Sequence, residues 1–347
     1  MFHHAPNRMT ATLRVLAVGA VALLGLVGCS TGGDTSETSA ESTLPAAEGA
    51  TQYPLTLPSP FGDTVLEDRP ERVAVVTAAT YDSDALIALG VTPVFAPSTL
   101  ERNAWLDPAV VASVETLWDS SEGSEVSAEQ VAASAPDLIV SLGSYDTFDQ
   151  EYFDRLSAIA PVLYAPIETL SWQELTRAVG EPLDLSASAD SLVRAAEERV
   201  AAAKAPHPQF EGRTAAQVTV YGPEYGAEYG SMPGTDMAAL FESLGFVLPE
   251  AASQFDPADG TVSDELVSRI DADFLLINTV GKDDVSYFLD APLVQQVPAI
   301  ADGRAVIDEA DPETGLNAFA WALGVQSDLS VPWAVDRLAE FGVEALG

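Results

Sequence analysis

The feature that most constrains the fold is an alternation of short apolar, β-rich runs with helical patterns, which occurs twice along the chain. In the first half, strand-like runs at 73–77, 92–96, 137–142 and 161–164 alternate with helical patterns at 82–89, 127–134 and 148–159. In the second half, strand-like runs follow at 216–221, 273–278 and 304–308. Strands that alternate with helices form parallel sheets covered on both faces. The pattern therefore predicts an α/β protein.

The two halves also correspond to each other in sequence. Residues 127–131 (SAEQV) match residues 263–267 (SDELV), and in both halves an aspartate opens a strand eight residues after the glutamate. A charged helical stretch at 188–204 separates the halves. We expect two similar three-layer lobes with mostly parallel sheets, joined by a single long helix, with a ligand cleft between the lobes.

The N-terminus has the pattern of a lipoprotein signal peptide. Arg8 and Arg14 precede an apolar run at 15–28, which is too short to cross a hydrocarbon core of ~30 Å as a helix. The run ends in Leu-Val-Gly-Cys29, which resembles the lipobox of bacterial lipoproteins. The resemblance implies removal of residues 1–28 and lipidation of Cys29. The alternatives are an ordinary secretory signal followed by a chance cysteine, and a start at Met9 instead of Met1.

The remaining boundaries follow from composition. Residues 29–52 are rich in Ser, Thr, Gly and Glu without apolar periodicity, and predict a flexible tether. We expect an N-terminal lobe at 53–170, a linking helical segment at 171–207 and a C-terminal lobe at 208–347. The location expected from the signal is extracytoplasmic, anchored to the cell membrane by lipid.

The charge of the chain excludes polyanionic partners. The 347 residues carry 15 basic and 53 acidic side chains, and loss of Arg8 and Arg14 with the signal changes the net charge from −38 to −40. Such a field opposes the approach of nucleic acid. Cys29 is the only cysteine, so once it is lipidated no disulfide can form and stability depends on burial.

Catalysis and direct metal capture lack the residues they need. No Gly-x-Ser-x-Gly elbow follows a predicted strand, because that pattern occurs only at 28–32, where the signal peptide ends, and no Gly-x-Gly-x-x-Gly motif occurs. His207, between two prolines, is the only histidine after residue 28. Capture of a bare transition metal would call for several imidazoles. We therefore expect neither an enzyme nor a protein with its own metal or cofactor, and we expect any iron to arrive already chelated.

Several phrases of the sequence resemble one family. PERVAVV at 70–76, DALIALGVTPV at 84–94, PDLIV at 136–140 and LSAIAPV at 156–162 are similar to the N-lobe of periplasmic binding proteins of ABC importers for iron-siderophores and cobalamin. The C-lobe resemblance covers 237–246, 262–273 and 292–306. It implies a rigid helix between the lobes, a monomer, and delivery of ligand to a permease dimer with its ATPase.

Ligand contacts are expected on the loops at the carboxyl ends of the strands. Aromatic side chains, which offer large faces for a bulky ligand, gather there. Residues 221–233, with their glycines and proline, are predicted to be an irregular loop. The candidates are Tyr81, Arg102, Trp105 and Tyr145 in the first half, and Tyr221, Tyr225, Tyr229, Met232, Lys282 and Trp321 in the second. Each of these rings can instead pack onto its own lobe, and Trp321 and Asn317 fit equally well as core residues of a helix at 316–323.

The ligand's charge follows from the basic residues. Only Arg102 and Lys282 are expected on loops that face the cleft, so a highly anionic chelate would be poorly compensated. We therefore favour a hydroxamate-type ferric siderophore, with a cobalamin or haem carrier, or a sensor or adhesion lipoprotein that reuses the fold, as alternatives.

Glu129 and Glu265 occupy matching positions in the two halves. The resemblance implies that one glutamate on each lobe docks into the permease, where ion pairs fix orientation. The alternative is that both are first-turn helix acids stabilised by the helix dipole.

Overall fold

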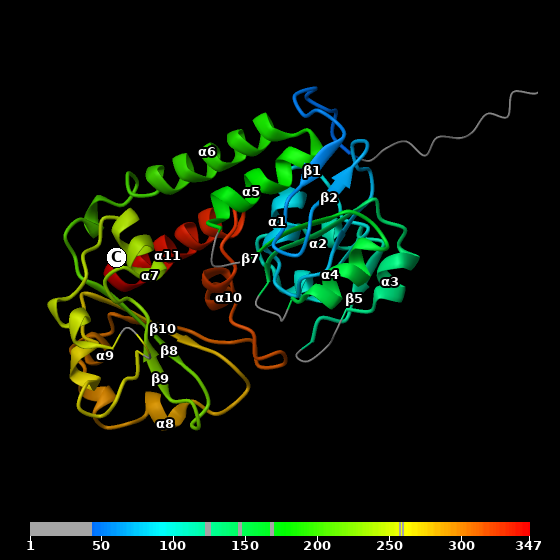
Figure 1. Ribbon diagram of the computed structural model, residues 1–347. Helices are drawn as coiled ribbons and strands as arrows, with labels where there is room; N and C mark the ends of the chain where they lie inside the picture. Colours follow the sequence, from blue (N-terminus) through cyan, green and yellow to red (C-terminus); the bar gives the residue numbers. More distant parts are fainter. Residues whose placement is uncertain (1–43, 122–125, 145–147, 167–169, 257, 259) are drawn as a thin grey trace, which may run out of the picture. The chain divides into compact units, whose positions relative to one another are not determined.

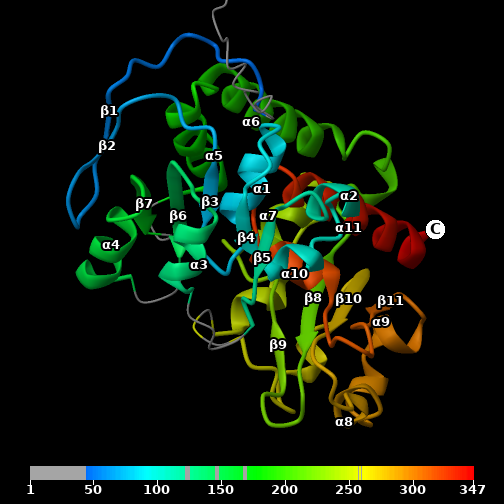
Figure 2. The same cartoon turned by 90° about the vertical axis from the view of Figure 1, so that its right-hand side faces the viewer.

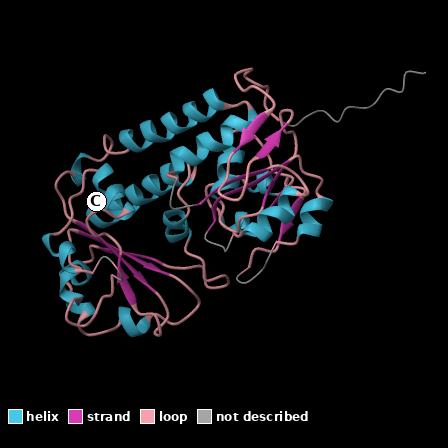
Figure 3. Cartoon of the chain, viewed as in Figure 1, coloured by secondary structure: helices cyan, strands magenta, loops and turns pink. Residues whose placement is uncertain are grey.

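The computed structural model describes residues 44–121, 126–144, 148–166, 170–256, 258 and 260–347. Its strands lie in two separate sheets and one small antiparallel pair (Figure 3). The antiparallel pair consists of β1 (Leu55–Leu57) and β2 (Thr64–Leu66). The expected parallel α/β architecture is confirmed in both halves of the chain.

The first half contains a five-stranded parallel sheet in the order β5-β4-β3-β6-β7 (Figure 2). Its strands are β3 (Val73–Val75), β4 (Phe95–Pro97), β5 (Thr116–Trp118), β6 (Leu138–Ser144) and β7 (Val162–Pro166). Its connections contain α1 (Tyr81–Ala88), the 3₁₀ helix η1 (Ser98–Arg102), α2 (Pro108–Val111), α3 (Ala128–Ala133) and α4 (Gln150–Ser157). The predicted cap of α3 is present, because Ser127 Oγ accepts from Gln130 N at 3.4 Å.

Both faces of this sheet are buried, because successive strand residues point to opposite sides. Val73 and Val75 pack in one core cluster with residues of α1, α5 and α6, and Ala74 packs in another with residues of α3 and α4. Strands buried on both sides therefore read as continuous apolar runs, which is the pattern seen in the sequence.

Two helices follow the first sheet. They are α5 (Trp172–Gly180) and α6 (Ser186–Ala202), with η3 (Glu181–Leu183) between them. The long helix α6 lies beside α5 and also contacts α11 (Figure 1). Helix α6 covers most of the charged stretch at 188–204, and the expectation that a single long, rigid helix joins the two lobes stays a prediction.

The second half contains a four-stranded sheet in the order β11-β10-β8-β9. Its strands are β8 (Ala215–Val220), β9 (Ala227–Tyr229), β10 (Phe274–Thr279) and β11 (Ala305–Asp308), of which β9 is antiparallel to β8 and the others are parallel. Its α-helices are α7 (Asp236–Ser243), α8 (Ser286–Leu289), α9 (Pro298–Ala301), α10 (Ala318–Gly324) and α11 (Ser330–Leu346). The 3₁₀ helices are η4 (Pro208–Phe210), η5 (Glu250–Gln254), η6 (Val267–Arg269) and η7 (Val294–Gln296).

The tether prediction is wrong for residues 44–52. Asp184, at φ +54°, accepts hydrogen bonds from the backbone N–H groups of Gly49, Ala50 and Thr51 at 2.7–2.8 Å. Glu48 accepts from the first N–H groups of α6, at Ala187 and Ser188. The Glu48 carboxylate thus accepts from orphan N–H donors of the helix N-terminus, and its contacts together with those of Asp184 hold this segment against the start of α6. Residues 29–43 lie outside the described part of the chain.

Within the described ranges, no helix combines the length and apolar character needed to cross a membrane.

Candidate functional site: a cavity at the strand ends

A cavity of about 420 Å³ lies where β8 and β10 end. Tyr221 and Val280 are the residues that directly follow these two strands, and both line it. Other lining residues are Gln217, Thr219, Asn317 and Trp321. Ligands of open α/β sheets bind outside the carboxyl ends of the strands, so this cavity, named the strand-end cavity below, is the candidate site.

Trp321 forms one wall of the strand-end cavity. Its helix is capped at the N-terminus, and its ring is hydrogen-bonded to the first half of the chain. Asn317 caps α10, since its Oδ1 accepts from Ala320 N at 2.8 Å. The indole Nε1 of Trp321 donates to Asn103 Oδ1, also at 2.8 Å, and the Arg102 guanidinium lies 5.8 Å from the ring centroid. The first half of the chain therefore contributes to the site through Arg102 and Asn103.

A row of polar side chains crosses the second sheet beside the cavity. The parallel register places Asn278 between Thr219 of β8 and Asp308 of β11. Asn278 Nδ2 donates to Asp308 Oδ2 at 3.0 Å, and Asn317 Nδ2 donates to the same carboxylate at 2.8 Å. The same hydrogen-bonded row thus supports the sheet end and the start of α10.

Asp84, buried in α1, organises the neighbouring segments. Its carboxylate accepts from Asn103 Nδ2, Trp105 Nε1 and Ser327 Oγ at 2.7–2.8 Å. Burial, and to a lesser extent the charge of nearby Asp328, raises the pKa of Asp84 to about 7, although these hydrogen-bond donors lower it. Asn103 also accepts the hydrogen bond from Trp321, so Asp84 supports the position of that ring indirectly, through Asn103.

Tyr81 and Trp105 are placed in this supporting layer. Tyr81 is buried, and its hydroxyl donates to the carbonyl of Gly324 at 3.0 Å. The Trp105 ring lies 5.8 Å from that of Trp333. Neither residue lines the strand-end cavity, so the structure brings them near Trp321 without placing them in its wall.

The prediction of an irregular loop at 221–233 is wrong for its middle. Residues 227–229 form β9, because one edge of β8 is free to pair with the returning chain. Tyr229 on this strand is 1 % exposed and stacks on Phe255 with the centroids 4.0 Å apart, and Met232 is in the same core cluster. Tyr229 and Met232 are thus packing residues here, which argues against both as ligand contacts.

The other two tyrosines of this segment are accessible. Tyr225, at the hairpin turn, is 73 % exposed. Tyr221 lines the strand-end cavity, and partial burial together with the neighbouring Glu228 raises its phenol pKa. Its carbonyl accepts from the Tyr287 hydroxyl at 3.0 Å. Tyr221, Trp321 and Arg102 are therefore the predicted candidates that the structure brings together.

The remaining candidates lie at the margin of the site or away from it. Lys282 is exposed beside Gly315, a cavity residue at φ +75° where a Cβ would come within 2.9 Å of Lys282 Cγ. Glu129 is exposed in the first turn of α3, whereas Glu265 is exposed in a turn before η6, so the helix expected to match α3 is not formed there. Tyr145 and Cys29 lie outside the described residues.

Gln217, Thr219 and Asn278 were missed by reasoning from the sequence. Their signal was present, since each is a polar residue within an otherwise apolar buried strand. A buried polar side chain needs hydrogen-bond partners, so its presence in such a strand points to a polar network or a site.

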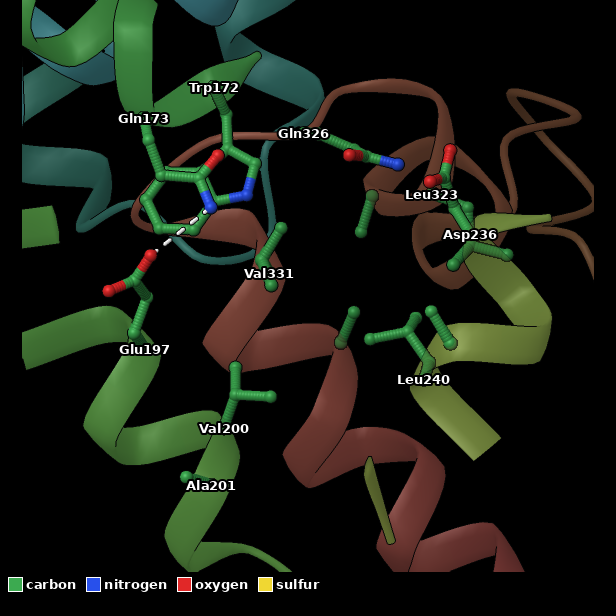
Figure 4. Close-up of a pocket in the computed structure, with 13 residues that line it drawn as sticks. Trp172, Gln173, Glu197, Val200, Ala201, Asp236, Leu240, Leu323, Gln326 and Val331 are labelled. Atoms are coloured by element: carbon green, nitrogen blue, oxygen red, sulfur yellow. Dashed lines mark hydrogen bonds between the residues drawn. The ribbon is translucent and has the colours of Figure 1, made fainter. Parts of the chain in front are cut away.

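A second cavity, of about 340 Å³, lies among α5, α6, α7, α10 and α11. Figure 4 shows Val200, Leu240 and Val331 directed toward it and Gln173 hydrogen-bonded to Glu197, at 3.3 Å. It adjoins the strand-end cavity, because Asp236 and Leu323 line both. Its walls come from these helices and from Gln326, between α10 and α11, so it lacks the strand-end position typical of ligand sites in this fold class.

In the described ranges, no three or more His, Cys, Asp or Glu side chains are grouped so as to hold a metal ion. The strand-end cavity instead presents aromatic rings, amides and hydroxyls, which suit an organic ligand.

The fold is that of an α/β protein, and its candidate site lies at the ends of parallel strands. The chain belongs to the periplasmic binding protein family, whose model matches residues 73–312. The membership confirms the resemblance drawn from the sequence.

The curated relatives and solved structures that are similar to the chain include the following three. The ferric enterobactin-binding periplasmic protein FepB of Escherichia coli O6:H1 is 28 % identical over 169 residues, which are 46 % of this chain and 51 % of FepB. The chain thus spans about half the length of that relative. The probable siderophore-binding lipoprotein YfiY of Bacillus subtilis is 23 % identical over 250 residues, 68 % of this chain and 74 % of YfiY. The crystal structure of a periplasmic solute binding protein from Mycobacterium smegmatis has a TM-score of 0.66 at 23 % identity and covers 84 % of this chain and 99 % of that one, which shows the fold.

Proposed function

We propose that this protein is the substrate-binding component of an ABC importer and carries a ferric siderophore in the strand-end cavity. The observation that carries the proposal is the wall built by Tyr221 and Trp321, with Arg102 over the indole, at the carboxyl ends of the strands. Aromatic walls suit a bulky amphipathic chelate. Membership of the periplasmic binding protein family and similarity to the siderophore-binding proteins FepB and YfiY support the same ligand class.

The ligand we favour is a neutral or cationic chelate of the hydroxamate type. Arg72, Arg177, Arg199, Lys204 and Arg304 each form an ion pair with a carboxylate on the protein surface. Among the described residues, four basic side chains form no ion pair within 4.0 Å, namely Arg69, Arg102, Arg269 and Lys282. Arg69 donates to backbone carbonyls and Arg269 to the Gln254 amide, whereas Arg102 and Lys282 lie beside the cavity. Two cations compensate a trianion poorly in a chain whose net charge is −38.

Delivery is the second part of the proposal. The lipid on Cys29 would hold the monomeric protein at the outer face of the cell membrane. Glu129 and Glu265, both exposed, would dock into the two permease subunits, where complementary charge speeds encounter and fixes orientation. The test of this step is uptake, which needs docking, measured beside ligand affinity, which does not.

A fluorescence titration tests the ligand class. The full chain, solubilised in detergent, is titrated with ferric hydroxamate, catecholate and citrate complexes, cobalamin and haem, at physiological salt. We expect quenching of tryptophan emission and the tightest binding with a ferric hydroxamate. A tris-catecholate that binds more tightly than every hydroxamate would contradict the charge argument. Preference for cobalamin or haem would replace the ligand class, and binding of none would favour a sensor or adhesion protein.

A further inference from the structure

Two buried amide side chains line the strand-end cavity, that of Asn317, which caps α10, and that of Gln217. The residue lies in the middle of β8 and is 2 % exposed, yet it lines the cavity. Its backbone N–H donates to Ser231 Oγ at 3.0 Å, which fixes the strand at this point. A buried amide has two donors and two acceptor sites to satisfy, so its orientation has consequences for whatever enters the cavity.

The polar row across the sheet determines which end of the amide faces the ligand. The Asp308 carboxylate accepts from Asn278 Nδ2, so Asn278 presents Oδ1 to Gln217. Gln217 Nε2 therefore donates to Asn278 Oδ1 at 2.9 Å, and its second hydrogen goes to Thr219 Oγ1 at 2.8 Å. Both donors of the amide are used within the protein. The free end is an acceptor, Oε1, and none of the described residues donates to it.

Gly230 leaves space for this oxygen. It lines the cavity opposite β8, and its N–H donates to the Gln217 carbonyl at 3.0 Å. A Cβ at Gly230 would come within 2.1 Å of Gln217 Oε1, so a side chain there would displace the amide. The close approach of these residues depends on a glycine at this position.

We propose that Gln217 Oε1 is a specificity-determining acceptor, and that the ligand places an N–H or O–H donor against it. The inference rests on the proposed function, and it narrows the ligand to chelates that carry amide N–H or hydroxyl groups outside the iron coordination shell. A ligand without such a donor would leave the buried oxygen unpaired, and discrimination of this kind is typical of sites built to hydrogen-bond a ligand.

The test uses two neutral probes that differ at their amide nitrogens. One is the ferric complex of N-acetylated desferrioxamine B, and the other is the same complex with each amide N–H replaced by N–CH₃. Dissociation constants of both are measured by calorimetry for the wild type and for Gln217→Met, which keeps the side-chain length but has no amide. Gln295→Met, the same substitution at an exposed residue that does not line the cavity, is the matched control. Circular dichroism verifies that each variant is folded.

We expect the wild type and Gln295→Met to prefer the N–H probe by about tenfold, and Gln217→Met to bind both probes alike. Gly230→Ala should lose the preference as well, because its methyl group displaces the oxygen. An equal preference in wild type and Gln217→Met, or no preference in the wild type, would overturn the inference while siderophore binding stands. Failure of the wild type to bind either probe would overturn the proposed function and the inference together.

Discussion

The indole Nε1 of Trp321 donates to Oδ1 of Asn103, 218 residues earlier in the chain, at 2.8 Å. Asn103 passes the connection on, because its Nδ2 donates to the buried Asp84 carboxylate at 2.8 Å. One amide side chain thus joins a wall of the candidate site to the supporting layer of the first half. The hydrogen bond that the Trp321 ring donates is therefore accepted by a group that does not line the cavity.

Asn103→Ala should lower the free energy of unfolding by roughly 1–3 kcal/mol, since it leaves the Trp321 indole N–H without its acceptor and removes one donor from Asp84. Urea unfolding followed by circular dichroism measures the change. The control is Arg102→Ala, whose exposed ring contact should contribute at most about 1 kcal/mol. Equal small losses in the two variants would contradict the supporting role of Asn103.

The buried carboxyl of Asp82 should make the free energy of unfolding depend on pH. Burial raises its pKa to about 7, although Thr77 Oγ1 and Leu142 N donate to it. The carboxyl of Asp82 has a pKa of about 3.9 in the unfolded chain, which is lower than in the folded protein. Its contribution to the free energy of unfolding is therefore fully present below about pH 4 and is lost as the pH rises to about 7. Asp82→Asn cannot ionise, and its stability relative to wild type should rise by roughly 2–3 kcal/mol from about pH 5 to about pH 8.

Urea unfolding at both pH values measures this difference, and the exposed Asp63→Asn serves as the control. The amide of Asp82→Asn has its own burial cost, but that cost is the same at both pH values. A relative stability that does not change with pH would show that the Asp82 carboxyl ionises normally in the folded protein.

The architecture was predictable because it follows from patterns of residues that are close together in the sequence. Apolar runs such as 73–77 and 273–278 are long enough to be buried on both faces, and Gly90, at φ +78°, ends the α1 segment as expected. The site was less predictable, because its residues depend on register between strands distant in sequence. Gln217, Asn278 and Asp308 form one network only once three strands are aligned.

The errors have the same origin. Tyr229 looked available because glycines surround it, yet pairing of β9 with β8 turns its ring onto Phe255. Residues 44–52 looked like tether because their composition is polar, yet Glu48 and Asp184 hold them through backbone hydrogen bonds. Contacts of this kind have no periodicity along the chain, so composition alone cannot reveal them.

Glu129→Ala and Glu265→Ala should leave ligand affinity unchanged and impair uptake, with the greatest loss in the double variant. Both carboxylates are exposed and neither lines the strand-end cavity. Uptake of a radio-iron siderophore by cells that express each variant measures the effect, and the exposed Glu224→Ala is the control. Normal uptake by the double variant would remove the docking role.

Cys29→Ser should release the protein from the membrane without altering its affinity for ligand. The lipid would be the attachment, and a single cysteine is available to carry it. Fractionation of washed membranes followed by immunoblotting measures the distribution. Retention of the variant in the membrane fraction would contradict lipid anchoring at this residue.

The most direct test of the account is the affinity of one ferric hydroxamate for two tryptophan variants. Trp321 lines the strand-end cavity and not the second cavity among the helices, whereas Trp172 lines that second cavity and not the strand-end cavity. Trp321→Ala and Trp172→Ala therefore each alter one of the two cavities. Calorimetry of the wild type and both variants should show a loss of about tenfold or more for Trp321→Ala, because a large aromatic face is removed, and little change for Trp172→Ala. The reverse result, with affinity lost in Trp172→Ala and kept in Trp321→Ala, would contradict the placement of the ligand at the strand ends.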